Sequence, residues 1–120
     1  MQVTSFYPMY GTKDVESAVA FFANFGFSVR HTIERAGLSI RVLENDAGLR
    51  MDVINSPVVP GEGFYGIRMN VPDLSEAVAF FEANGGTVLT PVVSHSASEL
   101  VYVRTQNGDI YCLSHHIKET

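Results

Sequence analysis

The sequence predicts an α+β fold made of two tandem copies of one βαβββ module, and a long internal repeat is the main reason. Residues 14–22 return 59 positions later as residues 73–81, with Ala-Val-Ala-Phe-Phe identical in both copies. Gly26 is matched in the same way by Gly85. A period near half the chain length is too long for a solenoid and indicates a duplicated module. Paired modules commonly place their ligand at the seam between them.

The composition is typical of a single globular domain. The chain has 120 residues, of which 46% are apolar and 18% charged, and this length can bury a sizeable core. A net charge of −5 argues against nucleic acid as a partner, because phosphate binding needs a basic face. One cysteine excludes an internal disulfide. Without a signal-peptide pattern or an apolar run of about 20 residues, we expect a soluble cytoplasmic protein with no membrane partner.

The first module is expected to cover residues 1–55. An alternating strand at 5–10 precedes a helix that Asp14 can cap, because its carboxylate can accept the unpaired amides of the first turn. Gly26 supplies the positive φ that ends a helix. Three strands follow at 27–34, 38–44 and 49–54, separated by turns at 36–37 and 46–48. The helix carries one apolar stripe, formed by Val15, Ala18, Val19 and Phe22.

The second module is expected to cover residues 64–120. It repeats the order with a strand at 65–71, a helix capped by Asp73, and strands at 87–92, 100–105 and 109–114. Residues 106–108 form the tight turn before the last strand. A linker at 56–63 joins the modules, because its two prolines and two glycines break regular structure. The stripe of the second helix is formed by Leu74, Ala77, Val78 and Phe81.

Two motifs within this order resemble those of a known superfamily. Asp-x-x-x-Ala-x-x-Phe-Phe follows the first strand of each module, and Asn-Gly-Asp-x-x-x-Leu lies at residues 107–113. The chain is therefore similar to the vicinal oxygen chelate superfamily, which includes glyoxalases, bleomycin-resistance proteins, fosfomycin-resistance enzymes and extradiol dioxygenases. The resemblance covers the whole chain. It implies a cup-shaped, half-open mixed sheet with the helices outside, a small-molecule ligand and a homodimer.

The resemblance also implies four positions at which metalloenzymes of the superfamily place their ligands. These positions are occupied by Tyr7, Asp52, Gly66 and Cys112. Glycine offers no side-chain donor, and one thiolate with one carboxylate is a poor match to an imidazole–carboxylate shell. We therefore expect that the family-type divalent-metal site is lost and that the protein uses no cofactor.

Strand alternation predicts which side chains face the cup, because successive residues point to opposite faces. Apolar pairs such as Ile40 and Val42, or Val101 and Val103, are expected to face the helices. The alternate positions then face inward. The predicted ligand-binding residues are Tyr7, Met9, Arg41, Asp52, Arg68, Tyr102, Arg104 and Cys112.

Several of these inward residues are basic although the chain is acidic overall. Arg50 has the same parity, and Arg41, Arg50, Arg68 and Arg104 could hold a carboxylate or phosphate through paired hydrogen bonds. A concave surface that carries guanidinium groups attracts anions. The alternative is that the arginines pair with carboxylates such as Asp52 or Glu44 and line a solvated face.

The four histidines do not define a catalyst by themselves. His95 lies in a polar segment, 94–98, that reads as a loop over the cup, where it could act as a gate or a general base or be an ordinary surface residue. His115 and His116 are expected past the last strand, as solvated residues, and His31 on an exposed strand. Neighbouring histidines on a strand would point to opposite faces.

Three functions remain open at this point. The first is a metal-free protein of the glyoxalase/bleomycin-resistance type that binds a small, anionic or amphipathic, partly apolar molecule. The second is an enzyme of the same superfamily, of the lyase, dioxygenase or thiol transferase type. It would use a non-standard metal site or acid–base chemistry through residues such as Tyr7, Asp52, Cys112 or His95. The third is a dimeric scaffold with a vestigial cup.

Overall fold

The computed structural model describes residues 2–35, 37–56, 61–95 and 98–116. It divides into two compact units, each with one α-helix and its own part of the β-sheet. The N-terminal module is Tyr7–Tyr65, and the C-terminal module is Gly66–Thr120 together with Met1–Phe6. Thr4 joins the C-terminal module by donating its main-chain N–H to the Asn70 carbonyl at 2.9 Å. The first strand therefore contributes to both units, a division that the sequence did not predict.

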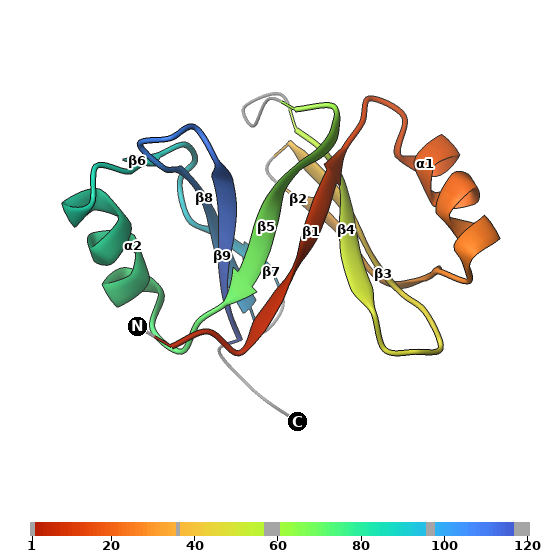
Figure 1. Ribbon diagram of the computed structural model, residues 1–120, viewed down its shortest axis with the longest axis horizontal. Coiled ribbons are helices and arrows are strands. Elements are labelled where there is room, and N and C mark those ends of the chain that lie inside the picture. Colours follow the sequence, from red (N-terminus) through yellow and green to blue (C-terminus); the bar gives the residue numbers. More distant parts are fainter. Residues whose placement is uncertain (1, 36, 57–60, 96–97, 117–120) are drawn as a thin grey trace. The chain divides into compact units, whose positions relative to one another are not determined.

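The N-terminal module places its helix on one side of a four-stranded sheet (Figure 1). Its elements are β1 (Ser5–Gly11), α1 (Val15–Phe22), the 3₁₀ turn η1 (Ala23–Phe25), β2 (Ser28–Arg35), β3 (Leu38–Glu44) and β4 (Arg50–Asn55). The strand order is β2-β3-β4-β1. β1 runs parallel to β4, and the remaining neighbours are antiparallel.

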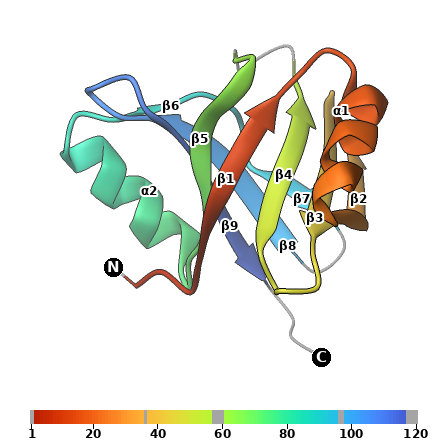
Figure 2. The same cartoon turned by 45° about the vertical axis from the view of Figure 1, so that its right-hand side comes forward.

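The C-terminal module repeats this plan with β5 (Gly63–Asn70), α2 (Leu74–Ala83), β6 (Thr87–Val88), β7 (Val93–His95), β8 (Ser98–Arg104) and β9 (Ile110–His116). The order is β5-β9-β8-β6, with β5 parallel to β9, and β7 pairs with β8. Figure 2 shows α2 lying along this sheet. The α+β class and the tandem βαβββ plan are confirmed. The predicted cup concerns the placement of the modules relative to each other and stays a prediction.

Two sequence-based boundaries in this module were wrong. The single strand expected at 87–92 is two short strands, β6 and β7, and a proline at 91 separates them; proline lacks the N–H that a strand ladder requires. His95 therefore ends a strand instead of lying in a loop. β9 continues through His116, which pairs with Ser98. The histidine pair thus belongs to the last strand.

Each helix begins and ends as the repeat predicts. The Asp14 carboxylate accepts the Ser17 N–H at 3.0 Å, and the Asp73 carboxylate accepts the Glu76 N–H at 3.0 Å. The bond from Ser17 lowers the pKa of Asp14, because it stabilises the charged form. Gly26 and Gly85 both follow a helix with φ of 86°, the left-handed conformation that glycine adopts without a Cβ clash.

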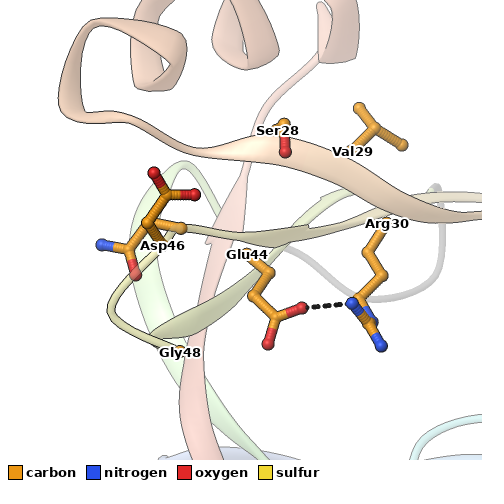
Figure 3. A pocket seen from close by; sticks show the side chains of 7 residues that line it. Ser28, Val29, Arg30, Glu44, Asp46 and Gly48 are labelled. Carbon is orange, nitrogen blue, oxygen red and sulfur yellow. Dashed lines mark ion pairs between the residues drawn. The ribbon is translucent and has the colours of Figure 1, made fainter.

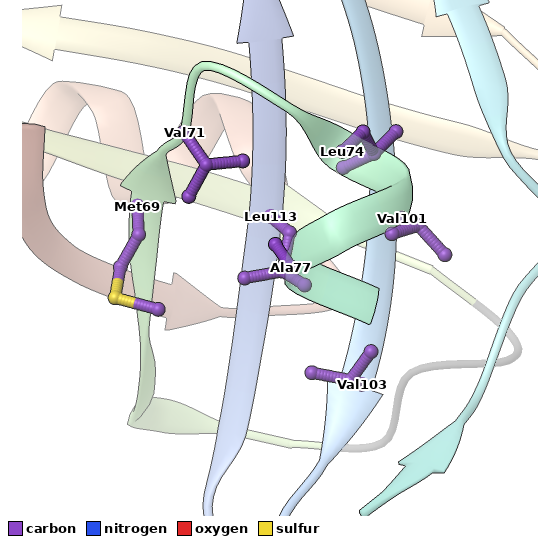
Figure 4. Packing of buried hydrophobic residues seen from close by; sticks show 7 residues of the cluster. All are labelled: Met69, Val71, Leu74, Ala77, Val101, Val103 and Leu113. Atoms are coloured by element: carbon purple, nitrogen blue, oxygen red, sulfur yellow. The ribbon is translucent and has the colours of Figure 1, made fainter. Parts of the chain in front are cut away.

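The apolar stripe of each helix packs on one face of its own sheet. Figure 4 shows the C-terminal core, in which α2 covers side chains from β5, β8 and β9. Its buried members are Met69, Val71, Leu74, Ala77, Val101, Val103 and Leu113. The N-terminal core is formed by Val15, Ala18, Phe22, Leu43, Met51 and Val53. Because strand residues alternate, these cores fix which side chains face away from the helices.

Candidate functional site

The sheet of the C-terminal module has a second buried face, on the side opposite α2. Arg68, Tyr102, Cys112 and Ser114 lie there, with exposed fractions of 5%, 0%, 0% and 1%; we call these four residues the polar face. Their neighbours Met69, Val101 and Leu113 point to α2, so alternation aims the polar face away from the helix. Arg68, Tyr102 and Cys112 therefore point away from α2 as the alternation predicts, whereas their place in a cup and their ligand-binding role stay predictions.

Adjacent strands bring the polar face together. In the strand register, Cys112 on β9 lies opposite Arg68 on β5 and opposite Tyr102 on β8. The thiol thus has a guanidinium-bearing neighbour on one side and a phenol-bearing neighbour on the other. The Tyr102 main-chain N–H donates to the Thr90 hydroxyl at 3.1 Å, which anchors the segment before β7 to β8. Arg104 shares this parity but is only half-buried and lies opposite Ile110.

Ser114 positions the Arg68 guanidinium. Arg68 Nε donates to Ser114 Oγ at 3.3 Å. Ser114 Oγ lies 3.3 Å from the Met69 carbonyl oxygen and 3.4 Å from Asn70 Oδ1, so its own proton has an acceptor in either direction. Asn70 Nδ2 in turn donates to Thr4 Oγ1 at 2.9 Å. Ser114 is not among the predicted ligand-binding residues, although its spacing of two residues from Cys112 places it on the same face of β9.

The N-terminal module buries a carboxylate on the corresponding face. Asp52 of β4 is 0% exposed and lies opposite Met9 of the parallel strand β1, which is also 0% exposed. Tyr10 packs on the α1 core, so Tyr7 and Met9 point away from the helix. Tyr7 is half-buried. The expected orientations of Tyr7, Met9 and Asp52 are confirmed, whereas their ligand-binding role stays a prediction.

The orientation predicted for Arg41 was wrong. Leu43 belongs to the α1 core, so Arg41, two residues earlier on β3, also points to the α1 side. Its guanidinium pairs there with Glu34 of β2 at 2.6 Å and with Glu16 of α1 at 3.7 Å. The prediction failed because Ile40, Val42 and Leu43 are all buried, and a strand buried on both faces shows no usable alternation.

The carboxylate of Glu34, which pairs with Arg41, is also stabilised by hydrogen bonds. The Ser39 hydroxyl donates to the Glu34 carboxylate, and Arg41 Nη1 donates to the same oxygen at 2.6 Å. These hydrogen bonds, that of Ser39 first, lower the pKa of Glu34 because they stabilise the carboxylate. The arrangement is an ion pair on the outer side of the module, in line with the alternative weighed for the arginines.

The N-terminal module has a polar pocket near the β3–β4 turn. It has a volume of about 520 Å³ and is lined by Ser28, Val29, Arg30, Glu44, Asn45, Asp46 and Gly48 (Figure 3). Arg30 Nη1 lies 2.7 Å from Glu44 Oε1, and Arg50 Nε lies 3.4 Å from Glu44 Oε2. Glu44 therefore forms ion pairs with two arginines, one of which, Arg30, lines the pocket with it.

The residues at the family metal positions do not fit a divalent cation. The N-terminal module offers a phenol and a carboxylate, from Tyr7 and Asp52. The C-terminal module offers no side chain at Gly66 and a thiol at Cys112. This donor set lacks the imidazoles that zinc, nickel and iron sites use. Within the described ranges, no three side chains from His, Cys, Asp and Glu come together as a metal-binding group.

Comparisons with known proteins identify the fold. No protein-family model matches the sequence, and no curated protein matches it. Solved structures do match. Methylmalonyl-CoA epimerase from Mycobacterium tuberculosis has a TM-score of 0.74 and 14% identity, covering 95% of this chain and 89% of that chain. A variant of the Streptomyces coelicolor methylmalonyl-CoA epimerase in complex with 2-nitronate-propionyl-CoA has a TM-score of 0.70 and 18% identity, covering 98% and 100%.

A hypothetical protein from Bacillus halodurans is also similar, with a TM-score of 0.72 and 13% identity over 98% of this chain and 99% of that chain. The chain therefore has the fold of the vicinal oxygen chelate superfamily, to which the epimerases belong. At these identities the likeness shows the fold, and function must be argued from the site.

Among the described residues, no helix is long and apolar enough to cross a membrane.

Proposed function

We propose that this protein is an enzyme of the vicinal oxygen chelate type that moves a proton on a small anionic carbonyl compound. The observation that carries the proposal is the guanidinium of Arg68, which is 5% exposed and held by Ser114. Burial of a charged group costs free energy unless it is paired and hydrogen-bonded. A buried charged group of this kind, beside a phenol and a thiol, is typical of a functional site.

Two residues of the polar face have roles in such a reaction. Arg68 would bind the anionic group of the substrate, or the oxygen on which negative charge develops when a proton leaves the neighbouring carbon. Cys112, which lies opposite Arg68 in the strand register, would accept that proton through its thiolate as a general base and return it, so that no atom is gained or lost. The comparison supports the substrate class, because the solved epimerases are seen with methylmalonyl-CoA and 2-nitronate-propionyl-CoA. An anionic acyl thioester is therefore the first compound to test.

The test is deuterium exchange at the carbon next to the carbonyl. The protein is incubated in D₂O with methylmalonyl-CoA, with propionyl-CoA or with a free 2-methyl dicarboxylate, and the mass gain is measured. Parallel reactions contain EDTA or added Co²⁺, so that a metal requirement is visible. We expect exchange to be slowed by about 100-fold or more in Cys112→Ala, the usual scale for general base removal.

The control for Arg68 is Arg50, an arginine of the N-terminal module that pairs with Glu44. Arg50→Met should leave exchange unchanged, whereas Arg68→Met should raise KM for an anionic compound. Failure of the parent protein to exchange any of these compounds, with or without metal, would refute the enzymatic proposal.

A metal-free binding protein is the second candidate, and the residues at the family metal positions favour it. Tyr7 and Gly66 replace metal ligands with groups that bind divalent cations poorly. Such a protein would sequester an anionic, partly apolar molecule through Arg68. Its signature is a rise in melting temperature with a ligand in the absence of deuterium exchange. We also propose that the protein acts as a homodimer, as the family resemblance implies.

A further inference from the structure

The N-terminal module carries an exposed aromatic surface that the proposed function does not use. Phe21, Phe25, Leu49 and Phe64 have exposed fractions of 58%, 58%, 60% and 61%; we call these four residues the aromatic patch. The last three line a pocket of about 430 Å³. The other lining residues are Pro8, Phe22, Phe27, Arg50 and Met51.

Ring contacts make the aromatic patch continuous. The Phe22 ring centroid lies 5.4 Å from that of Phe21, 6.2 Å from that of Phe25 and 6.0 Å from that of Phe64. Phe21 and Phe25 are themselves 5.4 Å apart. The exposed rings are thus fixed around one buried ring, which reduces the side-chain entropy that binding would otherwise cost.

The fold does not require apolar residues at the positions of the aromatic patch. The turn at residues 105–109 of the C-terminal module shows this, because it matches the turn at residues 45–49. In the N-terminal module the Asn45 N–H donates to the Leu49 carbonyl at 3.1 Å, and the Gly48 N–H donates to Asn45 at 3.0 Å. In the C-terminal module the Thr105 N–H donates to the Asp109 carbonyl at 2.8 Å, and the Gly108 N–H donates to Thr105 at 2.9 Å. Leu49 and Asp109 therefore occupy the same place in one turn.

The helix ends show the same contrast. The Phe27 N–H donates to the Phe22 carbonyl at 3.3 Å, and the Gly86 N–H donates to the Phe81 carbonyl at 2.7 Å. This match makes Asn84 the counterpart of Phe25 in the repeat. The pocket at the equivalent place of the C-terminal module has polar residues in its lining, among them Asn84 and Gln106. The same scaffold is stable with polar residues, so packing alone does not explain the aromatic patch.

A second copy of this chain fits the aromatic patch better than a small molecule does. Among the described lining residues, only Arg50 has a polar side chain, and Glu44 already pairs with it; ligand pockets normally add a few polar groups that orient the ligand. Three phenylalanines about 60% exposed present roughly 270–440 Å² of apolar surface. That is about a third to a half of the roughly 800 Å² per partner in a standard interface, as expected for an apolar centre with a polar rim.

The charges around the aromatic patch and the number of such patches per chain also agree with self-association. A two-fold contact brings a surface against itself, so it must be neutral or carry both signs. Asp46 and Arg50 have opposite charges on either side of Leu49. In the C-terminal module Asn84 and Asp109 replace Phe25 and Leu49, although Phe80 repeats Phe21. The complete aromatic patch therefore occurs once among the described residues, which favours a closed pair over a filament.

We infer that the aromatic patch of the N-terminal module is the contact surface between two copies of this chain. This inference rests on the proposed homodimer and adds its location. Aromatic residues at the centre of an interface carry most of its binding free energy. Loss of one of them should raise the dimer dissociation constant by at least about 30-fold, the equivalent of 2 kcal/mol.

The test is the molar mass in solution, measured by light scattering after size-exclusion chromatography over a range of concentrations. Leu49→Asp and Phe25→Asn copy the residues of the second module, so both should fold. The parent should have twice the chain mass of 13.2 kDa, and both variants should have the single mass at the same concentration. Phe80→Asn is the control, because Phe80 is 48% exposed on the other module and should leave the dimer intact.

Each other outcome is decisive. A dimeric parent with dimeric variants overturns the location while the homodimer stands. A monomeric parent overturns both. If circular dichroism shows that the variants are unfolded, hydroxyl-radical labelling of Phe25 and Phe64 in the parent decides. Protection that is lost on dilution supports the interface, and equal labelling at all concentrations refutes it.

Discussion

Replacement of Leu113 by alanine should destabilise the protein strongly, because this side chain sits at the centre of the C-terminal core. Leu113 is 0% exposed and belongs to the cluster under α2. Removal of a buried leucine side chain to Cβ costs about 3–4 kcal/mol, from lost burial and the cavity left behind. A chain of this length is stable by about 6–18 kcal/mol. At about 4 °C per kcal/mol, the melting temperature should fall by about 12–16 °C.

Urea denaturation and thermal melts followed by circular dichroism measure this effect. The urea m-value should stay unchanged, because the folded state buries the same surface. Val88→Ala is the control, since Val88 is 37% exposed on the edge strand β6, and should cost less than about 1 kcal/mol. A loss below about 1 kcal/mol for Leu113→Ala would contradict the reasoning. It would mean that β9 presents its other face to α2, and the orientation of Cys112 and Ser114 would then be wrong.

Three further outcomes are expected. In Gly86→Ala the new Cβ would lie 2.7 Å from the Phe81 carbonyl oxygen, so the backbone must shift, and urea denaturation should show a loss of about 1–3 kcal/mol. Ser114→Ala removes the acceptor of the buried Arg68 Nε–H and should cost about 1.5–3 kcal/mol; a change below about 0.5 kcal/mol would show that Ser114 does not hold the guanidinium. The lowered pKa of Asp14 means that its contribution to stability is present above its unfolded pKa of about 3.9 and is lost as pH falls through the lower folded value. Asp14→Asn should therefore flatten the acid limb of the stability–pH curve, and an unchanged limb would exclude Asp14 as a contributor.

The sequence was sufficient for the elements whose causes are local. Both helices follow from a capping aspartate and one apolar stripe, and a glycine with φ of 86° comes within a few residues after each of them. Strand faces were predictable on β5, β8 and β9, because one parity is apolar and packs under α2 while the other holds Arg68, Tyr102 and Cys112. On β3 both parities are buried, so alternation gave the wrong face for Arg41.

The burial and hydrogen bonding of the site residues could not be predicted from the local sequence. The exposed fraction of Arg68 and its bond to Ser114 depend on strands 46 residues apart in sequence, which no single-strand pattern reports. Strand ends were also uncertain, since His115 and His116 are polar yet continue β9 through main-chain pairing with β8. Pairing between strands decides such boundaries, and composition does not.

The shared hydrogen-bond pattern of the two β-turns has an evolutionary consequence. Main-chain hydrogen bonds and the side chain of the first residue, Asn45 or Thr105, hold each turn. The side chain at the last position takes no part in these bonds, so it can change from leucine to aspartate while the turn is kept. Gene duplication thereby supplies one copy that preserves the framework and another whose surface can drift toward a new contact. A chimera in which residues 45–49 and 105–109 exchange places should accordingly fold, with an aspartate in place of Leu49 and a leucine in place of Asp109.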